Sequence, residues 1–427
     1  MRRHRQGGWY RKKSFRHFDL PLPFYDAAKL VNDTARVAKH GFFPFIGFTD
    51  TKRKFRTDPH QDRALPKKLR KKIVKVKQRP LKYCAHVDGY IHSYYAFHLQ
   101  RLYEAFLENE RLGQCVLGYR SGLGTNINLA NDAFREIHQR RDCCVIALDI
   151  EAFFDSIDHF VLKQNLKFIL GVDRLSDDWM AVFQSMTKFS WIDQADIEKA
   201  IGIPWAQLPR RVCSIEDFRG ILRQRGFIQQ NKKNYGIPQG SPISAVLSNI
   251  YMLEFDKEVM NFVQKFGGSY RRYSDDILII CPRDEHQKIL SLVNCAIVKL
   301  GKSLKINEDK TEIAFFSMIN NSQTCSKMLS YLGFSFDGER KLIKSATLSR
   351  YYRRMTYRAR SAKNRAKDLK SSTVFKRALY SNFSHLGRAG IYSYARRAAS
   401  TFEDESPKRQ LRRHMKILHR ELGDEDG

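Results

Sequence analysis

Apolar runs and helically spaced apolar residues alternate along the chain from about residue 79 onward. The continuous apolar run 143–148 predicts a strand that is buried on both faces. A second run, 277–281, follows a strand-like stretch ending at Tyr273, and together they predict a β-hairpin. Apolar positions at helical spacing predict helices within 79–112, 126–139, 159–169, 243–253 and 285–300. The pattern therefore indicates a mixed α+β fold.

Two helix starts can be predicted from local chemistry. Ser241 is a good N-cap residue, and Pro242 suits the first position of the helix that continues over 243–253. Asp158 is a fair N-cap for the helix over 159–169. Both helices are therefore expected to begin at these polar residues.

The remaining segments are read from composition and shorter patterns. Tryptophans within 170–235 indicate a packed helical insertion. Short strands are predicted over 312–316 and 331–336. Beyond about residue 345 the chain is rich in Lys and Arg and lacks a strand pattern, which predicts a basic helical bundle.

The length and net charge of the chain indicate its domain number and the kind of partner it binds. The 427 residues exceed one ordinary core, so two or three lobes are expected. The chain carries 76 Lys and Arg against 45 Asp and Glu, a formal net charge of +31. Such a charge is most easily explained by a polyanionic partner, with nucleic acid first and a membrane surface second. A membrane-spanning segment would need about 18 consecutive apolar residues, and the sequence has no such run.

The cysteines and the N-terminus point to a cytoplasmic protein. The eight cysteines are scattered, and no Cys-x-x-Cys pair occurs, so a zinc site or a disulfide framework is not expected. A reducing compartment fits this usage. The first residues are basic but lack the apolar stretch of a signal peptide.

Basic and aromatic residues are interleaved at both ends of the chain. In residues 1–78 basic clusters, among them the run 67–77, alternate with phenylalanines. This composition suits a groove for single-stranded nucleic acid, or alternatively a solvated basic face over a phenylalanine core. Near the other end, Arg353, Arg354 and Arg358 lie among tyrosines and are expected to contact a nucleic-acid backbone.

Three acidic residues are candidate ligands for a metal ion. Asp275 and Asp276 are adjacent at the expected hairpin turn, where two like charges repel unless a cation neutralises them. Mg²⁺ would do so, because it prefers oxygen ligands from one or two carboxylates. A solvated polar turn is the alternative. Asp149 directly follows the buried strand 143–148, where an unpaired charge would be costly, although an Asp beside a helix start is common.

Two loops and one lysine could serve a phosphate-bearing ligand. Gly236–Gly240 reads Gly-Ile-Pro-Gln-Gly, a constrained loop whose backbone can approach a ligand closely. Gly118–Gly124 is a glycine-bearing loop with one arginine, Arg120, and by itself has little specificity. Lys310 lies in a turn before a short strand.

In this order, Asp149, the Gly-x-Pro-Gln-Gly loop, the Tyr-x-Asp-Asp hairpin, Asn307-x-x-Lys310-Thr311 and Leu332-Gly333-Phe334 resemble the palm of a reverse transcriptase. The likeness covers about residues 79–336 and is greatest to the bacterial group II intron and retron-type lineage. The resemblance implies a right-hand polymerase with fingers, a ferredoxin-like palm of antiparallel sheet and helices, and a helical thumb. The implied parts are a basic N-terminal extension (1–78), fingers (79–148), palm (149–338, with an insertion at about 170–235) and a thumb with a C-terminal tail (339–427).

The resemblance also implies roles for individual residues. Asp149, Asp275 and Asp276, with the carbonyl of Ile150, would hold two Mg²⁺ ions, for which Mn²⁺ can substitute. Phe154 would exclude a 2′-hydroxyl, with Phe153 as the alternative. The remaining implied roles are a nucleotide pocket at Gln239, triphosphate contacts at Arg79 and Arg120, protonation of the leaving pyrophosphate by Lys310, and nucleic-acid contacts at Tyr273 and Gly240.

The implied activity is RNA-directed DNA polymerisation, in which dNTPs and an RNA template give cDNA. Neither the DNA-binding and endonuclease region of group II intron proteins nor the retron thumb signature Val-Thr-Gly is found. The chain therefore looks most like stand-alone defence-associated reverse transcriptases, which resist phage and often pair with a non-coding RNA. A splicing maturase and an RNA-dependent RNA polymerase are the alternatives. The template, the priming mode and the oligomeric state stay open, and an oligomer is compatible with the sequence.

Overall fold

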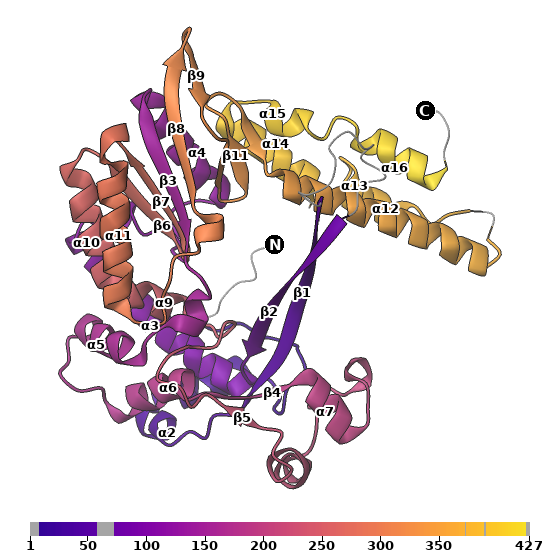
Figure 1. The fold of residues 1–427 in the computed structure, drawn as a ribbon. Coiled ribbons are helices and arrows are strands. Elements are labelled where there is room, and N and C mark those ends of the chain that lie inside the picture. Colours follow the sequence, from indigo (N-terminus) through magenta and orange to yellow (C-terminus); the bar gives the residue numbers. More distant parts are fainter. Residues whose placement is uncertain (1–7, 58–71, 372, 388–389, 424–427) are drawn as a thin grey trace. The chain divides into compact units, whose positions relative to one another are not determined.

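The computed structural model describes residues 8–57, 72–371, 373–387 and 390–423 (Figure 1). The chain divides into two compact units, and each is described by itself. Unit 1 comprises Met1–Gly113, Glu151–Phe255 and Ile297–Lys305, and unit 2 comprises Gln114–Ile150, Asp256–Ala296 and Ile306–Gly427. The four-part division inferred from sequence stays a prediction. The first five residues of the basic run 67–77 lie outside the described residues.

Unit 1 is built around a small sheet with strand order β2-β1-β4-β5. Its longest part is an antiparallel ribbon in which β1 pairs with β2 from Ile46–Tyr83 to Thr57–Lys72, and β4 adds to β1 in parallel. The segment 170–235, expected to be helical, thus also supplies two short strands to this sheet. The strands of unit 1 are β1 (Phe45–Thr57), β2 (Lys72–Tyr83), β4 (Ser190–Asp193) and β5 (Gln229–Gln230).

Helices pack against the part of this sheet where β1 meets β4, through a cluster that includes Ile46, Ile192 and Ile197. Phe18 and Phe45 are buried and Phe43 packs against the core, so these N-terminal phenylalanines belong to the interior. The helices of unit 1 are α1 (Phe24–Asn32), α2 (Thr34–Ala38), α3 (His86–Asn109), α5 (His159–Leu170), α6 (Asp177–Thr187), α7 (Gln194–Ile201), α8 (Ile215–Asp217) and α9 (Ser244–Tyr251). Short 3-10 segments at Phe153–Ser156 and Trp205–Gln207 and a π-helical turn at Phe218–Arg223 connect them.

The two predicted helix starts turn out differently. Asp158 caps α5, because its carboxylate accepts hydrogen bonds from the backbone N–H groups of Phe160 and Val161. The prediction for Ser241 and Pro242 is wrong, since α9 begins only at Ser244. The physical reason is a competing partner: the Ser241 hydroxyl is hydrogen-bonded to the buried ring of His92, 2.9 Å away.

Unit 2 contains the sheet that carries the acidic residues, with strand order β6-β7-β3-β8-β9 and antiparallel pairing throughout. Helix α4 packs one sheet face with a cluster that includes Phe134, Val145, Leu278 and Phe316. Helices α10 and α11 run along the opposite face (Figure 1). The elements are α4 (Asn126–Arg140), β3 (Cys143–Asp149), α10 (Leu253–Lys265), β6 (Ser269–Tyr273), β7 (Asp276–Cys281), α11 (His286–Leu300), β8 (Glu312–Ile319) and β9 (Ser322–Cys325).

A second, smaller antiparallel sheet follows in unit 2, formed by β10 (Leu329–Tyr331), β11 (Phe334–Phe336) and β12 (Lys341–Ile343). The sequence pattern predicts one strand over 331–336, and this is wrong. Leu332 and Gly333 both have positive φ, 44° and 92°, and form a tight turn between β10 and β11. Such a two-residue turn reverses the chain, so the apolar run is a hairpin.

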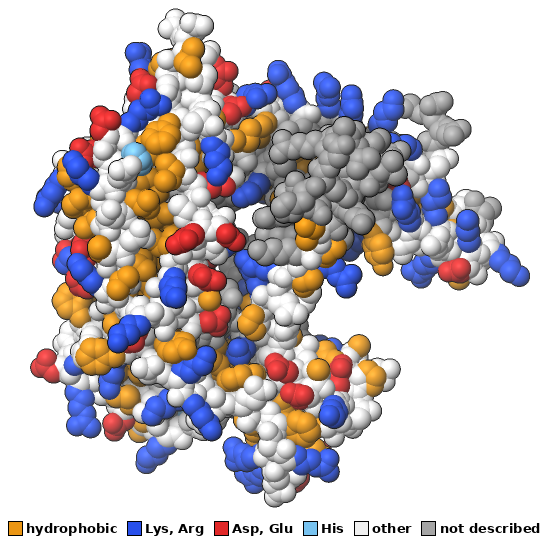
Figure 2. Space-filling view, in the orientation of Figure 1, with side chains coloured by type: hydrophobic (Ala, Val, Ile, Leu, Met, Phe, Trp, Pro, Cys, Tyr) orange, Lys and Arg blue, Asp and Glu red, His pale blue; other side chains and the backbone are white. Residues whose placement is uncertain are grey.

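The C-terminal part of unit 2 is helical, as the sequence predicts. Long helix α12 packs against α13 and α16 through Met355, Leu379, Phe383 and Leu418. Lys and Arg side chains line the visible edges of this helical region (Figure 2). The helices are α12 (Ser345–Asp368), α13 (Arg377–Phe383), α14 (Ile391–Phe402), α15 (Ser406–Arg409) and α16 (His414–Leu422).

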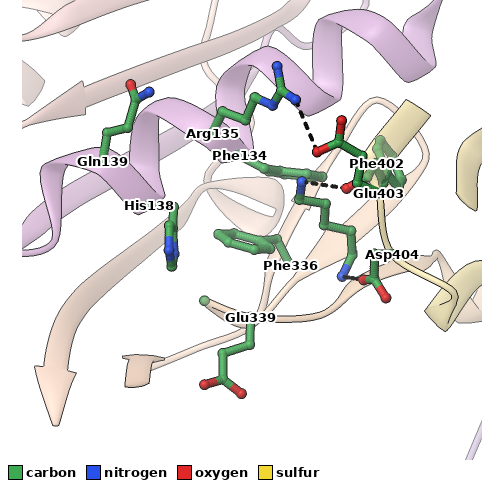
Figure 3. Close-up of a pocket in the computed structure, with 11 residues that line it drawn as sticks. Phe134, Arg135, His138, Gln139, Phe336, Glu339, Phe402, Glu403 and Asp404 are labelled. Atoms are coloured by element: carbon green, nitrogen blue, oxygen red, sulfur yellow. Dashed lines mark hydrogen bonds and ion pairs between the residues drawn. The ribbon is translucent and has the colours of Figure 1, made fainter. Parts of the chain in front are cut away.

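A hollow of about 470 Å³ opens in unit 2 where α4, the β11–β12 hairpin and the end of α14 meet (Figure 3). Its floor consists of phenylalanine rings, Phe134 and Phe336 among them. Its charged groups bind each other: Arg135 pairs with Glu403 at 3.4 Å, and the Lys341 ammonium donates to the Phe402 carbonyl at 3.1 Å. The first contact links α4 to the end of α14 and the second links β12 to α14, beside the apolar contact of Phe402 with Phe134.

Candidate active site

Asp149 and Asp276 lie directly opposite each other on neighbouring strands of unit 2. Antiparallel pairing of β3 with β7 matches Cys144 with Cys281 and ends with Asp149 opposite Asp276. Residues opposite each other in an antiparallel pair have Cβ atoms about 4.5–5.5 Å apart and share a sheet face. The apolar register of two buried strands therefore brings two carboxylates together that are far apart in sequence.

The third acid, Asp275, is held beside this pair by backbone hydrogen bonds. Ser274 and Asp275 form the turn between β6 and β7. The Ile150 N–H, one residue after Asp149, donates to the Asp275 carbonyl at 3.1 Å. The Asn307 N–H donates to the Asp149 carbonyl at 2.8 Å. The end of β3 is thus tied on one side to the hairpin turn and on the other to the loop before Lys310.

Mutual repulsion is visible in the acid–base properties of these groups. Asp276 still touches solvent, yet loss of hydration, followed by the charges of Asp275 and Asp149, raises the pKa of its carboxyl to about 6. The pKa of Asp275 is also raised, first by loss of hydration and also by Asp149. Lys310 acts in the opposite direction on both carboxyls. The cluster therefore holds more negative charge than the nearby cations balance.

This donor set fits a hard divalent cation such as Mg²⁺. Neighbouring carboxylates contribute to the raised pKa values of Asp275 and Asp276, and this repulsion is relieved when a cation with oxygen preference binds between the acids. The Lys310 ammonium contacts the Asp149 carboxylate. Among the described residues, no group of three or more His, Cys, Asp or Glu side chains is gathered closely enough to hold a metal ion. Carboxylate oxygens suit Mg²⁺ as ligands, and the ammonium of Lys310 is a positive charge beside Asp149.

A glycine-bearing loop packs against the same hairpin. The Leu117 N–H donates to the Arg272 carbonyl at 2.8 Å, and the Arg272 N–H donates to the Cys115 carbonyl at 2.8 Å. A Cβ atom on Gly118 would lie 2.5 Å from the Ser274 backbone nitrogen, so only glycine fits there without a shift. Arg120, predicted to contact a triphosphate, is half-buried and donates to the Val116 carbonyl of its own loop at 2.9 Å.

Behind the turn lies a buried ion pair. Arg272 on β6 and Asp256 on α10 have no solvent exposure. The Arg272 guanidinium donates to both Asp256 oxygens, at 2.7 and 2.6 Å, and a third N–H donates to the Ser274 carbonyl at 3.2 Å. The Tyr270 hydroxyl adds a bond to Asp256 at 2.5 Å. Because the pair is fully hydrogen-bonded, it fixes the base of the hairpin that carries the acids.

The predicted sugar-gate residues belong to unit 1. Phe153 is only 3% exposed and packs near Tyr251, with ring centroids 6.5 Å apart. Phe154 is half-buried, and its carbonyl accepts a hydrogen bond from the Ile237 N–H at 2.8 Å. Of the two rings left open by the sequence, Phe154 therefore has surface for a ligand, and Phe153 serves the core.

The Gly-x-Pro-Gln-Gly loop is pinned at both ends within unit 1. The Lys82 N–H on β2 donates to the Gln239 carbonyl at 3.0 Å. Gly240 has φ of +130°, and a Cβ there would lie 2.4 Å from the Lys82 carbonyl oxygen. The Ser244 hydroxyl donates to the Pro238 carbonyl at 2.7 Å. These contacts hold residues 238–240 of the loop, and the close approach of the Lys82 carbonyl explains why glycine is required at Gly240.

A buried histidine adds a further hold on this loop. The His92 ring lies between the hydroxyls of Ser185 and Ser241, each 2.9 Å away. Ser185 donates to the Val182 carbonyl, so it accepts from Nε2–H of His92, and Nδ1 accepts from Ser241. Burial lowers the pKa of His92 to about 3, which keeps the ring neutral. The neutral tautomer thereby links α3 and α6 to the loop.

The predicted residues thus fall into separate groups. Asp149, Ile150, Tyr273, Asp275, Asp276 and Lys310 come together in unit 2. Phe153, Phe154, Gln239 and Gly240 are gathered in unit 1. Arg79 is exposed on the β1–β2 ribbon opposite Asp50, apart from that second group. The thumb arginines Arg353, Arg354 and Arg358 are exposed on α12.

Sequence reasoning missed Asp256, Arg272 and Tyr119. Arg272 occupies an inward position of β6, where a charged residue needs a partner, and this alternation was a usable signal. Nothing local identifies Asp256 as that partner, because it lies on another element. Tyr119 carries no signal in the sequence beyond its place in a glycine-bearing loop.

Comparison with known proteins identifies the family. The model for the family "Reverse transcriptase (RNA-dependent DNA polymerase)" matches residues 70–336. The retron Ec83 reverse transcriptase of Escherichia coli is 30% identical over 123 residues, which cover 27% of this chain and 38% of that protein. The chain therefore belongs to the reverse transcriptase family. The predicted retron-like lineage and the α+β fold class of a right-hand polymerase with antiparallel palm sheet and helical thumb are confirmed.

Solved structures give only distant likenesses. Apo telomerase from Candida tropicalis aligns with TM-score 0.44 and 11% identity, covering 93% of this chain and 63% of that one. Telomerase from Candida albicans with a fragment of telomeric RNA aligns with TM-score 0.39 and 12% identity, covering 93% and 66%. The chain spans less than two thirds of the length of each of these relatives. No described helix has the length and apolarity to cross a bilayer.

Proposed function

We propose that this chain is an RNA-directed DNA polymerase that extends a primer with dNTPs on an RNA template. The observation that carries the proposal is the pairing of Asp149 with Asp276 on β3 and β7, with Asp275 in the adjoining turn. Three carboxylates at one sheet edge supply the ligands that nucleotidyl transfer needs. The family match over residues 70–336 supports the same activity.

Asp149, Asp275 and Asp276 would hold two Mg²⁺ ions, or Mn²⁺ in their place, with the Ile150 carbonyl as a further ligand. When bound, these ions promote ionisation of the primer 3′-hydroxyl and neutralise the developing charge on the triphosphate. Lys310 would leave Asp149 and donate its proton to the departing pyrophosphate. Arg120, released from the Val116 carbonyl, and Arg79 would bind the triphosphate.

Phe154, Gln239 and Gly240 would select the nucleotide. The half-buried ring of Phe154 stacks under the sugar and excludes a 2′-hydroxyl, while the pinned loop at Gln239 and Gly240 lines the nucleotide pocket and the template strand. Tyr273, half-buried beside the turn, contacts the primer strand. An RNA-dependent RNA polymerase would require a smaller residue in place of Phe154.

Primer extension with charge-neutral variants tests the catalytic assignment. Asp149→Asn and Asp276→Asn keep the side-chain shape but remove a negative charge, and each should lower the rate of dNTP incorporation by about 10²- to 10³-fold, the loss typical for one group that stabilises transition-state charge. Asp284→Asn, an exposed acid after the far end of β7, is the matched control and should extend like the wild type. Wild-type rates in Asp276→Asn would exclude the proposed site.

The sugar gate can be tested in the same assay. Phe154→Ala should raise the incorporation of rNTPs relative to dNTPs by about 10-fold or more, because the ring no longer meets the 2′-hydroxyl. Phe153→Ala is the comparison: it should reduce stability, since Phe153 is a core residue, without changing the ratio. A wild-type protein that prefers rNTPs would favour the RNA polymerase alternative.

We further propose that the template belongs to a dedicated non-coding RNA and that the protein acts in antiphage defence. The net charge of +31 and the likeness to a retron reverse transcriptase support an RNA partner. Sequencing of RNA that co-purifies with the protein should recover one dominant species. A preparation free of RNA that still extends primers would exclude the dedicated partner.

The alternative function is that of a maturase, which binds intron RNA and serves splicing. The two functions differ in their need for the acids. Asp276→Asn should abolish protection in a phage plating assay while leaving RNA co-purification unchanged. Full protection by Asp276→Asn would contradict a role of DNA synthesis in defence, and restored splicing of a bound intron by the same variant would favour the maturase.

A further inference from the structure

Tyr119 occupies a strained and exposed position beside the acidic hairpin. Its φ is +65°, a conformation that costs a non-glycine residue about 1 kcal/mol or more. Its side chain is 42% exposed, although large aromatic side chains are usually covered. Strain of this kind persists only where the surroundings enforce it, and it gathers at functional sites.

Two contacts enforce the position. Gly118, the preceding residue, lies so close to the turn that an added Cβ would meet the Ser274 nitrogen at 2.5 Å. The Ser274 hydroxyl then donates to the Tyr119 hydroxyl at 3.1 Å. Ser274 is itself strained, with φ of +62°, and is held from behind by Arg272. The ring of Tyr119 is thus fixed at its backbone and at its hydroxyl, and part of its surface stays open.

The neighbourhood decides what this surface can bind. The ring centroids of Tyr119 and Tyr273 lie 6.3 Å apart, with an angle of 41° between the ring planes, so the two tyrosines form a tilted aromatic pair. Asp275 and Asp276 are close enough to act electrostatically on the Tyr119 phenol. The two tyrosine rings themselves carry no charge and present flat faces. An uncharged planar partner, such as a base, or the face of a sugar suits the ring.

We propose that Tyr119 is a stacking platform for a nucleotide unit next to the catalytic acids, contacting its base or sugar. The inference rests on the proposed polymerase function and adds a binding residue to it. The nucleotide can come from two sources, the 3′ end of the primer or the incoming dNTP. Both present the same flat face, and binding measurements separate them.

The experiment compares Tyr119→Ala with Tyr119→Phe. The dissociation constant of a fluorescent primer–template is measured by anisotropy without dNTPs, and the KM for dNTP by primer extension. Loss of the ring should weaken one of these constants about 5- to 100-fold, as for other base–aromatic contacts. Tyr119→Phe keeps the ring and should stay within about twofold of the wild type. Tyr25→Ala, which removes a tyrosine that is 77% exposed on α1, controls for loss of an exposed ring.

Each result decides the matter. If Tyr119→Ala raises the dissociation constant for the primer–template, the ring contacts the primer end. If it raises the KM for dNTP, the ring contacts the incoming nucleotide. Wild-type values of both constants for Tyr119→Ala would overturn the inference, as would an equal loss in Tyr119→Phe, which would show that the hydroxyl only positions the turn. If the wild type extends no primer, the proposed function fails, but the anisotropy titration still reports whether the ring binds nucleic acid.

Discussion

Arg272 and Asp256 form a bidentate ion pair in which neither side chain is exposed to solvent, and the same guanidinium donates to the carbonyl of Ser274 in the turn between β6 and β7. Transfer of two charges into the interior is costly, and only complete hydrogen bonding offsets that cost. The pair therefore does more to position the turn than to stabilise the fold.

Replacement of Arg272 should show how much the fold depends on the buried ion pair. Arg272→Met leaves Asp256 buried with one hydrogen bond from Tyr270, and should lower the free energy of unfolding by about 3–5 kcal/mol. Arg271→Met is the matched control, because Arg271 is the neighbouring residue and pairs with Glu136 at a partly exposed site. It should cost at most about 1 kcal/mol. Chemical denaturation measures the free energy of unfolding of both variants. Equal decreases in the two variants would contradict a special role for the buried pair.

Gly118→Ala should displace the loop from the hairpin. The new methyl group would overlap the Ser274 backbone, and overpacking of this kind costs about 1–3 kcal/mol. We expect primer extension to fall more steeply than stability, since the clash falls beside Asp275. Gly41→Ala meets no atom within 4 Å and should leave both unchanged. Full activity in Gly118→Ala would show that the loop need not touch the turn.

Mg²⁺ should stabilise the wild-type protein without any substrate. Binding to the folded state raises the free energy of unfolding by about 1.4–2.7 kcal/mol when Mg²⁺ exceeds its Kd 10- to 100-fold. Asp276→Asn removes one of the repelling charges, so it should unfold at a higher temperature than wild type in EDTA and gain less from Mg²⁺. Differential scanning calorimetry measures both effects. An equal Mg²⁺ gain in Asp276→Asn would contradict its assignment as a ligand.

Buried histidines in unit 1 should contribute a loss of stability in mild acid, which the raised pKa of Asp276 opposes because its carboxyl takes up a proton in the folded state. Burial lowers the pKa of His17 to about 4 and that of His92 to about 3, against 6.5 for an exposed ring. Above pH 6.5 neither folded nor unfolded rings bind a proton. Below it only the unfolded rings do, so each contributes a loss of up to about 1.4 kcal/mol per pH unit, down to pH 4. Urea titrations between pH 7 and 4.5 measure this slope.

The control for that slope is a histidine at the surface. His92→Gln should flatten the pH dependence, since glutamine can bond both serines but does not titrate. His138→Gln, at an exposed position on α4, should leave the slope unchanged. A slope that is unaltered in His92→Gln would mean that other groups cause the loss.

Arginines on α12 should govern the salt dependence of nucleic-acid binding. Replacement of Arg353, Arg354 and Arg358 by Gln removes three exposed cations, and each one that neutralises a phosphate should lower the log–log salt slope by about 1. Arg412→Gln, exposed near α15, is the single-site control. Binding that is weakened equally at all salt concentrations would exclude phosphate contacts at these positions.

Elements with a local cause were predictable from sequence. The buried strands β3 and β7 appear as continuous apolar runs, and Asp158 caps α5 because the cap uses only neighbouring N–H groups. Asp149, Asp275 and Asp276 could be predicted as candidate site residues, because they lie at strand ends and match the family pattern. Their placement on one sheet edge confirms neither metal ions nor catalysis, which stay predictions.

Features that depend on distant partners could not be predicted. Ser241 has the chemistry of an N-cap, but its hydroxyl is hydrogen-bonded to His92, 149 residues away in the sequence. The Arg272 side chain is buried only because Asp256 comes from α10. The run 331–336 has the composition of one strand, yet positive φ at Leu332 makes it a hairpin. In each case a tertiary contact or a turn overrides the local preference.

The register between β3 and β7 has a consequence for how this chain can vary. Side chains alternate between the two faces of a strand, so deletion of one residue from 144–148 would rotate Asp149 to the reverse side of the sheet and place it away from Asp276. Substitutions among these apolar residues can be accommodated by repacking, whereas changes of length cannot. The number of residues in β3 is therefore under as strict a requirement as the aspartate at its end.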